Sequence, residues 1–355
     1  MSGSQSVTIL ETTLRDGSYA INFQFTAADT AIICAELEKA GFEFIEIGHG
    51  VGLGASEKGM GQAAETDEVY LKSAAEALSR ARFGMFCIPG VATLEHLDLA
   101  ADQGMGFVRV GTNVTEVETG KPFIAKAKQK GMYVSANMMK SYAMPPREMA
   151  DKALLLEDYG ADVLCVVDSA GGMLDDDLRQ YFEAIKARSN IPLGFHGHDN
   201  LGLAVAHSLR AVELGAVVVD GSLQGLGRSS GNAPTEILVA ALTRMGIRTG
   251  IDYLKVMDIG AKYIRPLIRR GGLGSLDLVA GYAQFHSSYM GTIRKFASKY
   301  RVDPRKLIIR LCEVDRVEAP AALVERLAQE LSRQGDEVFS ARFDFDEYFG
   351  DEQNR

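Results

Sequence analysis

The regular alternation of strand-like and helix-like segments constrains the fold of this 355-residue chain more than any other feature. Eight short apolar segments, most of them rich in Val, Ile or Phe and bounded by Gly or Pro, have the composition of buried parallel strands. Amphipathic stretches of helical period separate them. Eight strand–helix units within about 245 residues predict an α/β protein with a closed parallel (β/α)8 barrel, the TIM barrel. An open doubly wound sheet is the competing arrangement.

The eight predicted strands share a short, mostly apolar composition, and they are Val7–Leu14, Phe42–Ile47, Arg82–Ile88, Phe107–Gly111, Tyr133–Met138, Ala161–Asp168, Ile191–Phe195 and Ala216–Gly221. The eight helices that follow them are predicted over Ala27–Lys39, Glu65–Arg80, Thr93–Gln103, Lys121–Lys130, Pro146–Tyr159, Asp175–Ser189, Leu201–Leu214 and Pro234–Met245. Polar residues cluster just after the strands. In a barrel, the carboxyl ends of all strands lie on one catalytic face, which the open sheet explains less well.

Three regions are predicted from this pattern. Residues 1–250 form the catalytic barrel, and the alternation stops after Met245. Residues 251–333 read as a helical domain, because helical periodicity continues without strands. The predicted helices of this domain are Asp252–Arg265, Leu276–Tyr300, Pro304–Cys312 and Pro320–Arg333. Residues 334–355 form an acidic, aromatic tail without helical period, which we expect to be peripheral or partly disordered.

Composition excludes several classes of function. The formal net charge of −9 argues against a nucleic-acid partner. The four cysteines are isolated and show neither zinc-like spacing nor a disulfide framework. No run approaches the ~18 apolar residues of a membrane span, and the polar first residues lack the apolar core of a signal peptide. We therefore expect a cytoplasmic protein.

The stretch His196-Gly197-His198 carries the most specific chemistry. Residues i and i+2 of a strand point to the same face, so both imidazoles would lie side by side at a strand end. Asp16, at another strand end, can add a carboxylate. This mixed set suits Mn²⁺, Mg²⁺, Co²⁺ or Zn²⁺, with positions left for a 2-oxo acid, toward which the metal would act as a Lewis acid. The alternative is a pair of ordinary hydrogen-bonded core histidines.

Other polar residues are candidates for the same site. Arg15 is a fixed cation for an anionic substrate, and Ser169 could donate a hydrogen bond to a carboxylate. His49 and Asn137 follow strands and could line the pocket. Asn232, in the glycine-rich segment 225–234, could support the ligands or bind the metal weakly. It could equally be a helix N-cap, and both roles are compatible.

These motifs resemble those of the metal-dependent pyruvate aldolases and acyltransferases, whose barrel opens with Thr-Leu-Arg-Asp-Gly, here residues 13–17. The similarity to 4-hydroxy-2-oxovalerate aldolases covers about residues 7–331. The resemblance implies that Asp16, His196 and His198 bind a divalent metal, with Mn²⁺ the expected ion. It also implies that Arg15 stabilises the pyruvate enolate and the C4 oxygen, and that Ser169 binds the carboxylate.

The implied reaction is retro-aldol cleavage of a 4-hydroxy-2-oxo acid to pyruvate and an aldehyde. The resemblance further implies an acylating aldehyde dehydrogenase docked on the C-terminal helices. A homodimer through these helices is also expected.

Two positions depart from this aldolase pattern. The family's catalytic histidine, three residues after the metal aspartate, is here Tyr19, and a family tyrosine in the helical region is here His286. We interpret this as an exchange, with His286 as the acid/base and Tyr19 as its hydrogen-bonding companion, because an imidazole titrates near neutral pH and a phenol near pH 10. The alternative is that Tyr19 abolishes the base and the chemistry differs.

Two other functions compete with the aldolase. A Claisen-type synthase would join an acyl-CoA to a 2-oxo acid. Such synthases carry a glutamate where this chain has Ser18, and another in the glycine-rich loop, in the region where this chain has Arg228. HMG-CoA lyase uses a cysteine in that loop, which this chain lacks between Gly225 and Asn232. A catalytically weak scaffold barrel is favoured by Tyr19 and opposed by the intact metal set.

Overall fold

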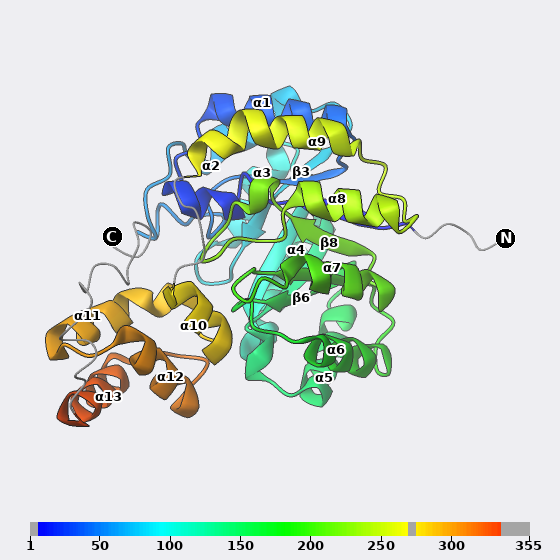
Figure 1. Ribbon diagram of the computed structural model, residues 1–355. Helices are drawn as coiled ribbons and strands as arrows, with labels where there is room; N and C mark the ends of the chain where they lie inside the picture. The colour runs from blue at the N-terminus through cyan, green and yellow to red at the C-terminus, as the bar shows by residue number, and fades with distance from the viewer. Residues whose placement is uncertain (1–5, 269–274, 335–355) are drawn as a thin grey trace.

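Eight parallel strands close into a barrel in chain order, with β8 hydrogen-bonded to β1 (Figure 1). This computed structural model describes residues 6–268 and 275–334. The tail predicted from residue 334 therefore lies, from residue 335 on, outside the described residues. The pairing of Thr8–Glu11 with Val218–Gly221 closes the sheet. The predicted TIM barrel is confirmed, and the open sheet is excluded.

Most strands are close to their predicted bounds, and they are β1 Thr8–Glu11, β2 Phe44–Glu46, β3 Arg82–Cys87, β4 Phe107–Asn113, β5 Tyr133–Met139, β6 Val163–Asp168, β7 Leu193–Gly197 and β8 Val218–Gly221. The barrel helices are α1 Ala27–Ala40, α2 Asp67–Ala77, α3 Leu94–Asp102, α4 Lys121–Gln129, α5 Pro146–Asp158, α6 Asp175–Lys186, α7 Ala204–Glu213 and α8 Thr235–Arg244. Apolar strand residues such as Ile45, Val108 and Val166 are fully buried between the strands and these helices.

Local signals in the sequence fix where α1 begins and ends. The Thr26 side chain accepts a hydrogen bond from the Asp29 N–H, and the Asp29 carboxylate accepts one from the Thr26 N–H. This capping box satisfies N–H groups that have no partner within the helix. Gly41 ends the helix at φ +106°, where an added Cβ would lie 2.4 Å from the Gly250 carbonyl oxygen. Glycine is therefore needed there for two reasons, the left-handed backbone and the close approach of the chain.

The region after the barrel is divided between two hydrophobic cores. The helix α9, Tyr253–Ile259, continues as a π turn over Gly260–Ile264, and its Val256 and Ile259 join the barrel core. The second core begins at Leu276 and is shared by α10 Ser275–Ala283, α11 Met290–Tyr300, α12 Pro304–Val314 and α13 Ala321–Gln334. Figure 1 shows these four helices as a lobe beside the barrel. This helical lobe starts later than the boundary expected at residue 251, because α9 packs on α1 and α8.

The single helix predicted over Leu276–Tyr300 is wrong. The chain leaves α10 at Gln284, which has a left-handed backbone with φ 56°, and makes a short 3-10 turn over Ser287–Tyr289 before α11 begins. The His286 side chain accepts a hydrogen bond from the Ser288 N–H, as an N-cap does. The apolar periodicity continues across this break because both helices face the same core, so periodicity alone could not locate it.

None of the helices within residues 6–268 and 275–334 is long and apolar enough to cross a membrane.

A carboxylate on α1 holds the segment that leads into β3. The Glu38 carboxylate accepts hydrogen bonds from the N–H groups of Ser79, Arg80 and Ala81, at 3.0, 2.6 and 2.7 Å. Partial burial opposes the charge, but these donors outweigh it and lower the pKa of Glu38 to about 2. A pKa below the unfolded value stabilises the fold above about pH 4.3, and this stabilisation is lost as the pH falls toward 2.

We predict that Glu38→Gln lowers the free energy of unfolding by about 1 kcal/mol at pH 7, because charge-assisted hydrogen bonds are lost at a partly exposed site. The gap between mutant and wild type should narrow as the pH falls below about 4. Urea unfolding of both proteins at several pH values measures this difference in the free energy of unfolding. Glu36→Gln, on the same helix and paired with Lys39, is the matched control. A gap that does not change with pH would contradict this role of the charge.

Candidate metal centre

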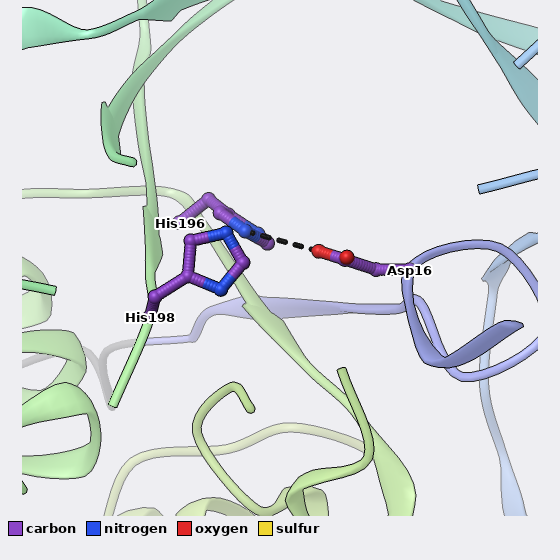
Figure 2. Close-up of side chains that lie close together, drawn as sticks. All are labelled: Asp16, His196 and His198. Atoms are coloured by element: carbon purple, nitrogen blue, oxygen red, sulfur yellow. Dashed lines mark ion pairs between the residues drawn. The ribbon is translucent and has the colours of Figure 1, made fainter. Parts of the chain in front are cut away.

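Asp16, His196 and His198 lie together at the carboxyl end of the barrel. One ligand atom from each residue lies within 4.8 Å of the other two, and all three side chains are buried. Figure 2 shows the carboxylate of Asp16 pointing toward the two imidazoles, with His196 Nε2 lying 3.3 Å from Asp16 Oδ2. The three side chains that the sequence analysis predicted as metal ligands are therefore neighbours in the fold.

The turn after β1 brings Asp16 to this position. β1 ends at Glu11, earlier than predicted, and the Asp16 N–H donates to the Thr12 carbonyl at 2.8 Å. The Thr12 hydroxyl donates to the Gly221 carbonyl of β8 at 3.0 Å, which fixes the turn to the neighbouring strand. Asp16 then opens a short 3-10 helix, Asp16–Ile21. The Asp16 carboxylate is therefore positioned by the hydrogen-bonded turn after β1, and not by the strand itself.

The two histidines come from the end of β7. His196 is in the strand, and His198 follows it, forming an isolated bridge with Asn232 of the glycine-rich loop. His196 Nδ1 lies 2.9 Å from Asp220 Oδ2, so Nδ1 donates to this carboxylate and leaves Nε2 to face Asp16. A carboxylate behind a metal-binding histidine sets its tautomer and raises its basicity.

The protonation of the three side chains suits a metal. Burial opposes ionisation of Asp16, but Arg15 and the His196 hydrogen bond outweigh it and hold the pKa of Asp16 well below its usual value. Burial and the nearby Arg228 charge hold the pKa of His198 well below 6.5, so this imidazole is neutral. Burial also opposes a charge on His196, but hydrogen bonds to Asp16 and Asp220 raise its pKa. A metal ion would replace that proton between Nε2 and Asp16.

Unsatisfied polar atoms provide an independent test of the metal interpretation. Among the described residues, buried Asp16 Oδ1 has no hydrogen-bond partner, and neither does the side-chain oxygen or nitrogen of buried Asn232. Buried polar atoms are rarely left unpaired, so such atoms beside two imidazoles fit a bound cation with its waters. The donor set of one carboxylate and two imidazoles therefore fits a divalent metal.

A network of buried charges that sequence reasoning missed lies behind the ligands. The Glu46 carboxylate accepts from Arg15 Nε and from Arg109 Nη1, each at 2.9 Å. Arg109 Nη2 also pairs with Asp220, the partner of His196. The sequence contains one indication of this network. Glu46, Arg109 and Asp220 are charged residues within otherwise apolar strand segments. Such charges are seldom buried unless they are paired.

Arg15, Ser169 and Asn137, three further predicted site residues, are buried. Arg15 Nη1 lies 3.6 Å from Asp16 Oδ2, so the guanidinium adjoins the metal ligand. Buried Ser169 accepts the Lys140 N–H through its hydroxyl oxygen at 2.9 Å, which leaves its proton for an acceptor. With its amide oxygen toward Arg109, Asn137 lies 2.6 Å from Arg109 Nη2. Asn137 therefore contacts the charge network.

His49 is engaged with its own loop. Its ring stacks on Phe23 with centroids 3.9 Å apart. Nδ1 accepts from the Val51 N–H at 3.0 Å, and Nε2 lies 3.2 Å from the Gly61 carbonyl oxygen. Burial lowers its pKa, which favours a neutral ring. A structural role in this loop accounts for His49, and its contact with substrate stays a prediction.

Tyr19 belongs to the barrel and His286 to the helical lobe. Tyr19 is half-buried in the 3-10 helix that Asp16 opens, with its ring against Phe23. His286 comes from the helical lobe, and its surroundings include the charges of Arg228 and Lys140. Burial and these two cations hold the pKa of His286 well below 6.5, so the imidazole is neutral. Their roles as base and companion stay predictions.

Comparison with known proteins identifies the family of this chain. The HMGL-like family model matches residues 6–262, which include the barrel and all three metal-ligand candidates. The chain belongs to the HMGL-like family.

Relatives of this HMGL-like chain are named 4-hydroxy-2-oxovalerate aldolase. The protein of that name from Carboxydothermus hydrogenoformans is 40% identical over 331 residues, covering 93% of this chain and 98% of the relative. 4-Hydroxy-2-oxovalerate aldolase 2 from Rhodococcus jostii is 40% identical over 309 residues, covering 87% and 90%. The resemblance predicted from the sequence motifs is confirmed over nearly the whole chain.

Solved structures of lower sequence identity share the fold. The HMG-CoA lyase from Brucella melitensis has a TM-score of 0.65 at 21% identity, covering 75% of this chain and all of that one. The carboxyl transferase domain of Rhizobium etli pyruvate carboxylase has a TM-score of 0.75 at 17% identity, covering 94% and 61%. At these identities the similarity shows a shared fold alone.

We predict that Asp220→Asn weakens metal binding about tenfold to a hundredfold, because the His196 ring loses the carboxylate that orients it. Titration calorimetry of the metal-free enzyme with Mn²⁺ measures this change. Asp98→Asn, at a surface ion pair with Lys126, is the control. Unaltered affinity in Asp220→Asn would show that the carboxylate does not support the ligand.

Proposed function

We propose that this protein is a divalent-metal-dependent pyruvate aldolase that cleaves a 4-hydroxy-2-oxo acid to pyruvate and an aldehyde, and catalyses the reverse condensation. The buried Asp16, His196 and His198 cluster beside Arg15 carries the proposal. Relatives that bear the 4-hydroxy-2-oxovalerate aldolase name, at 40% identity over most of the chain, support it.

The metal site defines where the 2-oxo acid would bind. Asp16, His196 and His198 would hold a divalent ion, which when bound supplies a Lewis acid that polarises the 2-keto oxygen. The Ser169 hydroxyl has a proton free to donate to the carboxylate of the substrate. Arg15 is kept rigid by Glu46 and the Asp16 carboxylate, so it can donate to oxygen atoms that gain charge during cleavage.

Cleavage needs a base for the C4 hydroxyl. His286 Nδ1 lies 2.7 Å from Ser288 Oγ and 3.3 Å from the Ser288 nitrogen, which fixes the ring. When Nδ1 accepts the Ser288 N–H, Nε2 carries the proton and the ring is not a base. In the other tautomer, Nδ1 gives up this contact and donates to Ser288 Oγ, and Nε2 can accept the hydroxyl proton. The C4 carbonyl then forms, the C3–C4 bond breaks, and its electron pair becomes the enolate of pyruvate. Arg15 stabilises the enolate oxygen, and protonation at C3 releases pyruvate.

The competing functions have less support in the described residues. A synthase would need a glutamate at the position of Ser18 and another in the loop region that holds Arg228. The Ser18 hydroxyl instead donates to the Arg15 carbonyl at 2.6 Å. A scaffold without activity would not need the unpaired buried side-chain atoms of Asp16 and Asn232. The finer parts of the prediction remain proposals: Mn²⁺ as the ion, a homodimer, an aldehyde dehydrogenase partner on the helical lobe, and a cytoplasmic location.

We expect purified enzyme to release pyruvate from a 4-hydroxy-2-oxo acid only when a divalent metal is bound. Chelation should abolish release and Mn²⁺ should restore it, while Asp16→Asn should lower kcat/KM at least about a thousandfold because the ligand charge is lost. Lactate dehydrogenase coupling follows pyruvate. Asp98→Asn serves again as the surface control. Metal-independent release would defeat the proposal, and CoA release from acyl-CoA with a 2-oxo acid would favour the synthase.

The exchange of acid/base and companion predicts a specific rescue. His286→Ala should lower kcat about a hundredfold and remove the acidic limb of the pH–rate profile, because a neutral imidazole is the base. Restoring the family's arrangement, with Tyr19→His and His286→Tyr together, should recover more activity than His286→Tyr alone. If His286→Ala retains most of its activity, His286 is not the base.

A further inference from the structure

Arg228 is a cation in the site that the proposed reaction does not use. It lies in the glycine-rich loop after β8, and its Nη2 is 2.8 Å from His198 Nε2. The same nitrogen donates to the Ser169 carbonyl at 3.1 Å, and Nη1 donates to Ser287 Oγ. All three partners are uncharged. In the part of the chain that the structure describes, no ion pair with a carboxylate neutralises this half-buried guanidinium.

The charges of the buried network beside the metal-ligand candidates nearly cancel without Arg228. The buried network has two positive side chains and three negative ones, which are Arg15, Arg109, Asp16, Glu46 and Asp220. A divalent ion and the carboxylate of a bound 2-oxo acid would bring this net charge to zero. Arg228 then adds one positive charge. Since uncompensated charge is costly in a poorly solvated site, this excess favours a substrate with a second negative charge.

The position of Arg228 indicates where this second charge would lie. Ser287, which accepts from Nη1, directly follows His286, the residue proposed to act at the C4 hydroxyl. The Ser169 hydroxyl, proposed to bind the C1 carboxylate, is engaged with the Lys140 N–H and not with Arg228. The other two contacts of the guanidinium, with the Ser169 carbonyl and Ser287 Oγ, do not involve a metal-ligand candidate.

A second cation lies on the same side. The Lys140 ammonium is buried, and it donates to the Tyr289 hydroxyl at 2.7 Å and to the Val317 carbonyl at 2.8 Å. Its nearest carboxylate among the described residues, Glu318, is 4.0 Å away and mostly exposed. The charges of Arg228 and Lys140 both act on His286. Glu318, Glu116 and Asp315 partly offset the charge of Lys140, so Arg228 is the cation that favours an anion there.

We propose that Arg228 binds an anionic group on the aldehyde half of the substrate. The enzyme would then prefer a dianionic 4-hydroxy-2-oxo acid, whose cleavage gives pyruvate and an aldehyde that bears a carboxylate. This inference rests on the proposed aldolase function and narrows its substrate class.

A binding experiment tests the anion site without turnover. 2-Oxoheptanedioate and 2-oxoheptanoate have the same chain length, lack the 4-hydroxyl group that retro-aldol cleavage needs, and differ in the charge at C7. Titration calorimetry of Mn²⁺-loaded enzyme should show 2-oxoheptanedioate binding about tenfold more tightly, as expected for one charge-assisted contact. Arg228→Gln should remove this preference, and Arg228→Lys should keep part of it. Arg188→Gln, at an exposed pair with Asp151, should behave as wild type.

A kinetic experiment separates this inference from the proposed function. Condensation of pyruvate is compared for succinic semialdehyde and for butanal, which differ in one carboxylate, and Arg228→Gln should lower kcat/KM about tenfold for the first alone. Turnover of both aldehydes without preference in wild type would overturn the anion site and leave the aldolase intact. If Arg228→Gln lowered kcat/KM equally for both aldehydes, or lowered the affinity equally for both 2-oxo acids, the anion site would also be overturned. Arg228 would then contact a group that both ligands share. Absence of turnover with every aldehyde, with the calorimetric preference intact, would instead count against the aldolase.

Discussion

A closed circuit of buried charges determines what this barrel can do. Each member contacts the next within 3.6 Å, and the circuit runs through Arg15, Glu46, Arg109, Asp220, His196 and Asp16. Charges taken out of water are costly unless paired, so loss of one member would leave its neighbours uncompensated. Two metal-ligand candidates belong to the circuit. The orientation of the metal site is therefore coupled to the packing of polar groups across the whole interior of the barrel.

Two arginines illustrate how surroundings separate the roles of identical side chains. Arg15 is held by Glu46, contacts Asp16, and lies over the ring of Phe86 at 4.7 Å. It is a rigid donor whose charge the protein already balances. Arg228 has uncharged partners and lies on a loop with glycines on both sides. Its charge remains available to a ligand, and this difference cannot be read from residue type.

The sequence was informative where chemistry follows from local spacing. The alternation of segments predicted the barrel, and the two-residue spacing of His196 and His198 placed both rings on one face because strand geometry is local. The pairing of Glu46 with Arg109 depends on which strands are neighbours and on their stagger, so it required the closed sheet. The break at Gln284 was missed for a similar reason. The helices before and after it, α10 and α11, pack against the same hydrophobic core, so the apolar periodicity continues across the break.

The division into two hydrophobic cores has a consequence for how the enzyme would fail. The metal-ligand candidates belong to the barrel, whereas His286 is presented by the helical lobe, whose core is built from separate residues. Regions with separate cores can open with different free energies. Heating or denaturant could therefore detach the proton-transfer group while the cation stays bound, and the damaged enzyme would retain its metal yet turn over slowly. Occupancy by metal would then be a poor measure of how much competent enzyme a sample contains.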